Sequence, residues 1–159
     1  MKRVAFSTLA LMGVLGSVSA SAQDIVGSWK QTTFYQKVTS SGEKRFPFGE
    51  KVVGRSIFTK EGTFCSMATG MDRKQGAGAP NDEERVGLFK TMYAYCGKYR
   101  VDGSKFSAES DVAWAPNWTK QELHRSWKVD GKVLSMESAP FKSQLDNVDV
   151  VAVVEFERE

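Results

Sequence analysis

The chain has 159 residues, of which 22 are basic, 19 are acidic and one is a histidine. This length predicts one domain with one hydrophobic core. Basic and acidic residues are interspersed without a basic stripe, which argues against nucleic acid or an anionic membrane as a partner. One histidine and two cysteines are too few for a built-in zinc or iron site, so neither a metal nor another cofactor is expected.

The first 22 residues have the pattern of a cleaved signal peptide. Lys2 and Arg3 precede an apolar run over residues 4–18, and Ala20-Ser21-Ala22 fits a small-x-small cleavage site. The run is too short and too interrupted by glycine for a good transmembrane span, although an uncleaved anchor is the alternative. We expect export to the periplasm or secretion after cleavage near Ala22, no membrane anchor, and one domain over residues 23–159.

Three acidic-glycine pairs indicate β-hairpins. Glu61-Gly62, Asp102-Gly103 and Asp130-Gly131 each lie between two extended segments, and Asp-Gly supplies the positive φ that hairpin turns require. Three hairpins make at least six strands, and the runs over residues 25–38 and 148–158 add two. The sequence therefore predicts an all-β fold, an up-and-down antiparallel barrel of about eight strands in which the last strand pairs with the first and no sheet edge remains.

Strand alternation divides the side chains between the interior and the outer wall of this barrel. Two-residue turns at Asp102-Gly103 and Asp130-Gly131 would pair Tyr99 with Phe106 and Arg125 with Met136. Both pairs lie on largely apolar faces, which we assign to the interior.

Cys65 and Cys96 would reach a compartment where disulfides persist. A bridge would close a loop of about 30 residues and contribute about 3–4 kcal/mol, the alternative being two small buried apolar side chains. Cys96 falls on the outer face of its strand. The disulfide therefore requires the register in which Cys65 also points outward and Phe64 points inward.

The period of the sequence changes between residues 71 and 94. Asn81, three residues before Glu84, resembles a capping box, and Val86, Phe89 and Tyr93 recur at helical spacing. We expect one short amphipathic helix of about three turns, inserted between strands and lying across the barrel. A static plug is favoured over a mobile lid.

Trp29 and Arg158 are expected to close one end of the barrel. Trp29 begins the first strand, and Arg158 lies on the apolar face of the last strand. Pairing of the two strands would bring the guanidinium over the indole as a cation–π cap. The alternative is a solvated arginine near the chain end.

The sequence resembles the bacterial and fungal lipocalin-like domain family of the calycin superfamily, and an exported bacterial member in particular. The motifs that carry the resemblance occur in the family's order and approximate spacing over essentially the whole mature chain: Gly27-Ser28-Trp29, Pro47-Phe48-Gly49-Glu50, Val53-Gly54-Arg55-Ser56-Ile57-Phe58-Thr59, Tyr95-Cys96-Gly97-Lys98-Tyr99, Pro116-Asn117-Trp118 and Phe156-Glu157-Arg158. The resemblance implies an up-and-down barrel with an internal cavity. Relatives often carry a histidine where this chain has Ala108 and Glu109, so chemistry that depends on that imidazole is not expected here.

The interior assigned by strand alternation is aromatic and partly polar, and it supplies the candidate ligand-binding residues. Arg125 is expected to clamp an anionic group with the Tyr95 or Tyr99 hydroxyl, and Trp114, Trp127 and Phe106 are expected to form the wall. The same alternation also places Tyr35 and Val112 inside. The alternative for Arg125 is an arginine that extends to the rim or pairs with a loop carboxylate.

Three functions fit these features. The first is an exported, monomeric carrier of a small hydrophobic or amphipathic molecule with a polar or anionic head. The second is a calycin-type isomerase, cyclase or hydratase that uses tyrosine and arginine. The third is a structural or inhibitory barrel that binds another protein. His124, the single histidine, is expected on the outer wall, and no nucleophile or phosphate-loop motif is present, so catalysis is not the favoured function.

Overall fold

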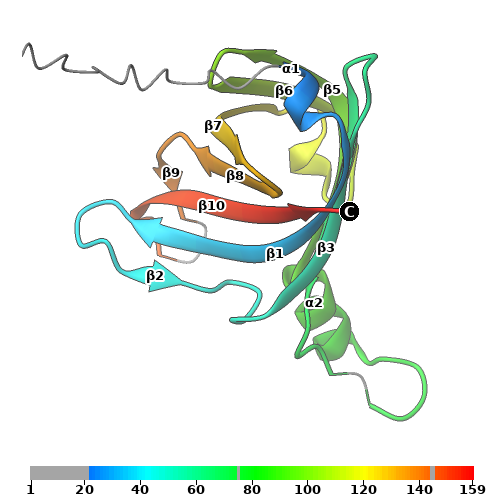
Figure 1. Ribbon diagram of the computed structural model, residues 1–159. Helices are drawn as coiled ribbons and strands as arrows, with labels where there is room; N and C mark the ends of the chain where they lie inside the picture. Colours follow the sequence, from blue (N-terminus) through cyan, green and yellow to red (C-terminus); the bar gives the residue numbers. More distant parts are fainter. Residues whose placement is uncertain (1–21, 75, 144–145) are drawn as a thin grey trace, which may run out of the picture.

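The structure, a computed structural model, describes residues 22–74, 76–143 and 146–159. It confirms a closed antiparallel barrel of eight strands (Figure 1). The barrel strands are β1 (Gly27–Val38), β3 (Val52–Phe58), β4 (Thr63–Gly70), β5 (Met92–Asp102), β6 (Lys105–Ala113), β7 (Glu122–Asp130), β8 (Val133–Ser138) and β10 (Asp149–Arg158). Each strand pairs with its neighbours in this order, and β1 also pairs with β10, so that the barrel has no free edge.

Smaller elements surround the barrel. They are α1 (Ala22–Ile25), β2 (Lys44–Arg45), α2 (Asp82–Lys90), the 3₁₀ turn η1 (Pro116–Trp118) and β9 (Phe141–Lys142). The two α-helices lie at opposite ends, α1 at the top and α2 at the bottom of Figure 1. No helix in the described ranges is long and apolar enough to span a membrane. The predicted signal peptide lies almost entirely outside the described residues.

The hairpin turns at Asp102-Gly103 and Asp130-Gly131 differ from the predicted ones by one position, whereas the loop that contains Glu61-Gly62 is longer than two residues and joins β3, which ends at Phe58, to β4, which begins at Thr63. Asp102 pairs with Lys105 and Asp130 pairs with Val133, so the two-residue loops begin at Gly103 and Gly131 rather than at the aspartates. Both glycines have positive φ, 54° and 58°, at the loop position where type II′ turns place glycine. The cross-strand pairs predicted from these two turns were therefore wrong by two residues.

This error did not change the faces of the strands, because a shift by two preserves alternation. Tyr99 pairs with Ala108 instead of Phe106, and Arg125 pairs with Ser138 instead of Met136. Phe106, Tyr99 and Trp127 remain on the inner face and are buried.

Two β-bulges did overturn predicted faces. The register between β1 and β10 shifts at Thr32, and the register between β5 and β6 shifts at Asp111. Each bulge adds one residue to a strand and reverses the alternation beyond it. Consequently Tyr35 and Val112, both predicted inside, lie on the outer side, where Tyr35 packs on Phe46 and Val112 is exposed.

The disulfide between Cys65 and Cys96 is confirmed, together with its predicted register. The two cysteines are directly opposite each other on β4 and β5, with their Cα atoms 4.1 Å apart. Cys65 faces outward and Phe64 is buried in the core. The bridge therefore staples two neighbouring strands on the outer wall.

The predicted helix forms, but it does not plug the barrel. The capping box is present: the backbone N–H of Glu84 donates to the Asn81 side chain and the backbone N–H of Asn81 donates to Glu84. α2 ends at Lys90, and none of its residues is buried. Tyr93, predicted on this helix, instead lies on β5 with its side chain in the core.

Trp29 and Arg158 close the end of the barrel covered by α1. The two residues are paired across β1 and β10, and the guanidinium carbon lies 4.2 Å from the centre of the indole ring. Arg158 also donates to the carbonyls of Val26, at 3.1 Å, and of Asp24. The indole N–H donates to the Ile25 carbonyl at 2.7 Å. The cap thus ties the last strand to the segment that precedes the first.

The variant Cys65→Ala/Cys96→Ala should lower the free energy of unfolding by about 3–4 kcal/mol, because the bridge restrains an unfolded loop of 31 residues. Urea denaturation measures the difference. A reductant should destabilise the wild-type chain and leave the double variant unchanged. Equal stability of the two proteins under oxidising conditions would contradict the assignment.

Replacing Arg158 with methionine should cost about 3 kcal/mol of unfolding free energy. The variant loses the cation–π contact and the two hydrogen bonds to carbonyls while keeping much of the side-chain volume. Urea denaturation followed by tryptophan fluorescence reports the loss. Arg100→Met, on the exposed outer face of β5, is the matched control and should change stability by less than about 0.5 kcal/mol; similar losses in both variants would argue against the cap.

Candidate ligand site inside the barrel

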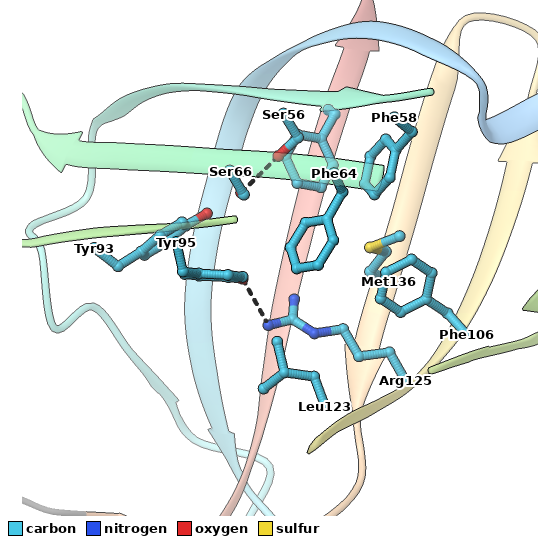
Figure 2. A pocket seen from close by; sticks show the side chains of 11 residues that line it. Ser56, Phe58, Phe64, Ser66, Tyr93, Tyr95, Phe106, Leu123, Arg125 and Met136 are labelled. Carbon is cyan, nitrogen blue, oxygen red and sulfur yellow. Dashed lines mark hydrogen bonds between the residues drawn. The ribbon is translucent and has the colours of Figure 1, made fainter. Parts of the chain in front are cut away.

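A small cavity of about 20 Å³ lies in the interior (Figure 2). Its lining residues come from seven strands: Ser56, Phe58, Phe64, Ser66, Tyr93, Tyr95, Phe106, Leu123, Arg125, Met136 and Phe156. A buried water needs roughly 10–15 Å³ measured in this way, so the cavity has room for one or two waters. The interior is therefore more completely filled than the resemblance to a cavity-bearing family led us to expect.

Arg125 brings a positive charge into this cavity. Its side chain extends from the inner face of β7, and Figure 2 shows the guanidinium directed toward the aromatic rings of the lining. One guanidinium N–H donates to the Tyr95 hydroxyl at 3.4 Å, and no other hydrogen bond or ion pair of Arg125 is found within the described ranges. A guanidinium has five N–H donors and stays charged, so most of its donors have no protein partner here.

Tyr95 belongs to a polar row that crosses the inner wall. The register places Ser56, Ser66 and Tyr95 opposite one another on β3, β4 and β5. The hydroxyls of Ser56 and Ser66, both buried, are 2.6 Å apart and hydrogen-bonded to each other. The cavity is therefore lined by one guanidinium group and several hydroxyl groups, and its other lining side chains are apolar.

Tyr93 forms a second buried polar contact beside the cavity. Its hydroxyl donates to Gln31 Oε1, while the Gln31 amide nitrogen, also buried, has no hydrogen-bond partner in the described part of the chain. Burial raises the pKa of Tyr93 far above the usual tyrosine range, and the neighbouring Tyr95 raises it further. Tyr93 is therefore neutral at physiological pH and acts as a hydrogen-bond donor rather than as a base.

A layer of aromatic side chains lies between the cavity and the end of the barrel opposite Trp29. Tyr93 packs on Phe48 at 5.9 Å and on Trp114 at 6.4 Å, and Tyr95 stacks on Trp118 at 5.6 Å, measured between ring centroids. Phe48 precedes β3, and Trp118 ends η1, so loops at this end supply the layer. Access to Arg125 from this end requires these rings to move.

Three of the six predicted ligand-binding residues meet at the cavity, and three lie elsewhere. Arg125, Tyr95 and Phe106 line it. The Tyr99 hydroxyl already donates to the Thr59 carbonyl at 2.7 Å. Two tryptophans complete the set: Trp114 lies at the rim beside Phe89 of α2, and Trp127 is buried in the core without lining the cavity.

The residues that sequence reasoning missed are Tyr93, Ser56 and Ser66. Tyr93 lies two residues before Tyr95 and six before Tyr99, so the three share one face of a strand, but Tyr93 also fits the helical spacing of Val86 and Phe89. The serines carry no signal of their own, because a buried serine is recognisable only after the register of its strand is known.

Arg125 also borders an open groove of about 810 Å³, formed with residues of β5, β6 and β8. Most of the groove's side chains, including Arg100, Lys105 and His124, lie on the outer faces of their strands. Alternation therefore makes this groove a feature of the outer wall, and the ligand site is better placed in the interior.

The raised pKa of Tyr93 predicts a pH dependence of stability. A neutral tyrosine in the folded state contributes stability that is fully present below the unfolded pKa of about 10 and is lost as pH rises toward the higher folded pKa. The unfolding free energy of the wild-type chain should therefore fall more steeply above pH 10 than that of Tyr93→Phe. Urea denaturation at a series of pH values measures both slopes, and parallel curves would contradict a buried, neutral Tyr93.

Comparison with known proteins accords with this geometry. No curated protein sequence matches the chain closely. A family model described as a lipocalin-like domain matches residues 26–158, which include all eight barrel strands, the capping pair and every residue that lines the cavity. The chain therefore belongs to the family of lipocalin-like domain proteins.

Proposed function

We propose that this protein is an exported barrel that binds a small, largely apolar molecule through an anionic or polar head. The observation that carries the proposal is the inward guanidinium of Arg125, which has one long hydrogen bond and no carboxylate partner among the described residues. A partly buried charge of this kind is stabilised when an anion accepts its free donors. The Tyr95 hydroxyl, already 3.4 Å from Arg125, would contact the same head group.

The size of the cavity limits how the ligand binds. About 20 Å³ accommodates part of a head group and no hydrocarbon tail. The tail would therefore pass through the aromatic layer beside Tyr93 and leave the barrel past Trp114. Met136 and Leu123, which line the cavity with flexible side chains, are suited to yield space.

Export is supported by the disulfide and by the sequence of the first 22 residues. A disulfide persists in oxidising compartments such as the periplasm or the extracellular space. Cleavage near Ala22 would also retain Asp24, whose carbonyl accepts a hydrogen bond from Arg158. The proposed mature domain, residues 23–159, thus keeps the cap that closes the barrel.

A second candidate is a structural or inhibitory barrel that binds another protein. The small cavity favours it, because a filled interior does not require a ligand.

The third candidate is a calycin-type enzyme, in which Tyr95 would be the proton donor and Arg125 would stabilise an oxyanion. It makes a separate prediction: the protein would convert a compound from cell extract, and Arg125→Ala would abolish the conversion. An unchanged compound found by native mass spectrometry favours the carrier.

Octanoate is a suitable probe because it combines a carboxylate with a short apolar tail. We expect residues 23–159 to bind octanoate more tightly than octanol, and we expect Arg125→Met to weaken octanoate binding about tenfold or more. Isothermal titration calorimetry measures both. Tyr95→Phe should cause a smaller loss, because it removes one hydrogen bond and no charge.

The matched control is Arg100→Met, which removes an arginine from the outer wall and should leave octanoate affinity unchanged. Equal affinity for octanoate and octanol, or an Arg125→Met variant that binds as the wild type does, would reject the anion clamp. Absence of any binding to the wild-type chain would favour the filled barrel.

A further inference from the structure

Aromatic rings form most of the lining of the cavity beside Arg125. Six of its eleven lining side chains are aromatic: Phe58, Phe64, Tyr93, Tyr95, Phe106 and Phe156. Several of these rings pack on one another. Phe64 packs edge-to-face with Tyr95 and with Phe106, and the ring centroids of these pairs are 5.7 Å and 6.4 Å apart. The apolar part of a ligand that enters the cavity therefore contacts mainly the faces and edges of rings.

This aromatic lining begins directly beside the charge. The Tyr95 hydroxyl contacts the Arg125 guanidinium at 3.4 Å, and the Tyr95 ring packs on Tyr93 at 5.3 Å and on Trp118 at 5.6 Å, measured between centroids. In Figure 2 the Phe64 ring also points toward the guanidinium. The first groups attached to an anion held by Arg125 and Tyr95 would therefore lie among rings.

The small size of the cavity favours a flat ligand. A volume of about 20 Å³ holds one or two waters, so the lining side chains must move apart for any organic ligand. A planar ring is thinner than a saturated ring or an alkyl chain, and it therefore requires the smallest movement. Leu123 and Met136 form the aliphatic part of the lining, and the flexible Met136 side chain can also place its sulfur against a ligand ring.

The energy of ring–ring contacts favours the same class of ligand. Edge-to-face and offset ring pairs are more favourable than burial of the same apolar area alone, so separating the lining rings removes favourable contacts. A ligand ring forms new contacts of this kind with Phe64, Tyr95 or Phe106, whereas a saturated ligand of the same size does not. For the head, a carboxylate is flat and can accept two parallel hydrogen bonds from one guanidinium.

We propose that the molecule bound in the barrel is an aromatic carboxylate. This inference rests on the proposed function, because it takes Arg125 as the partner of the anion and adds the chemical class of the apolar part. The carboxylate accepts hydrogen bonds from Arg125 and Tyr95, and the ring lies against the aromatic lining in place of part of the space that Leu123 and Met136 now fill.

A matched pair of ligands tests the aromatic class. 3-Phenylpropanoate and 3-cyclohexylpropanoate have the same number of carbons and the same charge, and the cyclohexyl ring is the more hydrophobic of the two. A site that selects only for apolar area would therefore bind the cyclohexyl ligand at least as tightly. We expect residues 23–159 to bind the phenyl ligand at least about fivefold more tightly, measured by isothermal titration calorimetry.

Two variants test whether the rings of the cavity cause this preference. Phe64→Leu keeps an apolar side chain and removes one lining ring, so it should reduce the ratio of the two dissociation constants at least about twofold. Because both ligands are measured on the same protein, a general loss of stability cancels from the ratio. Phe141→Leu is the matched control: Phe141 is 38% exposed on β9 and does not line the cavity, so its substitution should leave the ratio unchanged.

The variant Arg125→Met separates failure of this inference from failure of the proposed function. It should weaken the binding of both ligands and leave the preference for the phenyl ring. If the wild-type chain binds the cyclohexyl ligand as tightly as the phenyl ligand, and Arg125→Met weakens both, the aromatic class is overturned and the anion clamp stands. If Arg125→Met binds both ligands as the wild type does, or if the wild type binds neither, the clamp is rejected, and the aromatic carboxylate with it.

Discussion

The pairing of β1 with β10 is the constraint on which the rest of the structure depends. An antiparallel sheet of this length exposes unpaired N–H and C=O groups at both edges unless its ends meet. The two terminal strands meet over most of their length, and Arg158 fixes their ends by covering Trp29 and binding the carbonyls of Asp24 and Val26. Closure creates an interior, and only in a closed barrel does an arginine on the inner face of β7 lie against buried side chains rather than on an open surface.

The interior accommodates polarity by pairing it. The serine pair and the contact between Tyr93 and Gln31 satisfy hydroxyls that would otherwise cost free energy to bury. The Gln31 amide nitrogen and the Trp127 indole nitrogen are buried without a hydrogen-bond partner among the described residues, but both belong to neutral groups. Arg125 differs from them because it carries a charge, and a single hydroxyl at 3.4 Å is its hydrogen-bond partner among the described residues. This under-paired cation distinguishes the proposed site for an anion from an ordinary polar core.

The sequence predicted the barrel, its closure and the disulfide because these depend on features that are local or repeat with a simple period. Acidic-glycine pairs mark the turns, and alternation assigns faces as long as a strand is regular. Prediction failed for Tyr35 and Val112, where the added residues at Thr32 and Asp111 reverse alternation without any compositional signal. It failed for Tyr93 because helical and strand spacing both fit the same aromatic residues.

The candidate site was predictable only in part, for the same reason. Arg125, Tyr95 and Phe106 lie on regular stretches of strand, so alternation placed them correctly on the inner face, whereas Trp114 follows the bulge and lies at the rim. The most direct measurement of the central claim is a crystal structure of residues 23–159 grown with octanoate. The account predicts the carboxylate inside the closed barrel, within hydrogen-bonding distance of Arg125 and Tyr95. Octanoate bound only on the outer wall, or an Arg125 guanidinium directed into solvent, would contradict it.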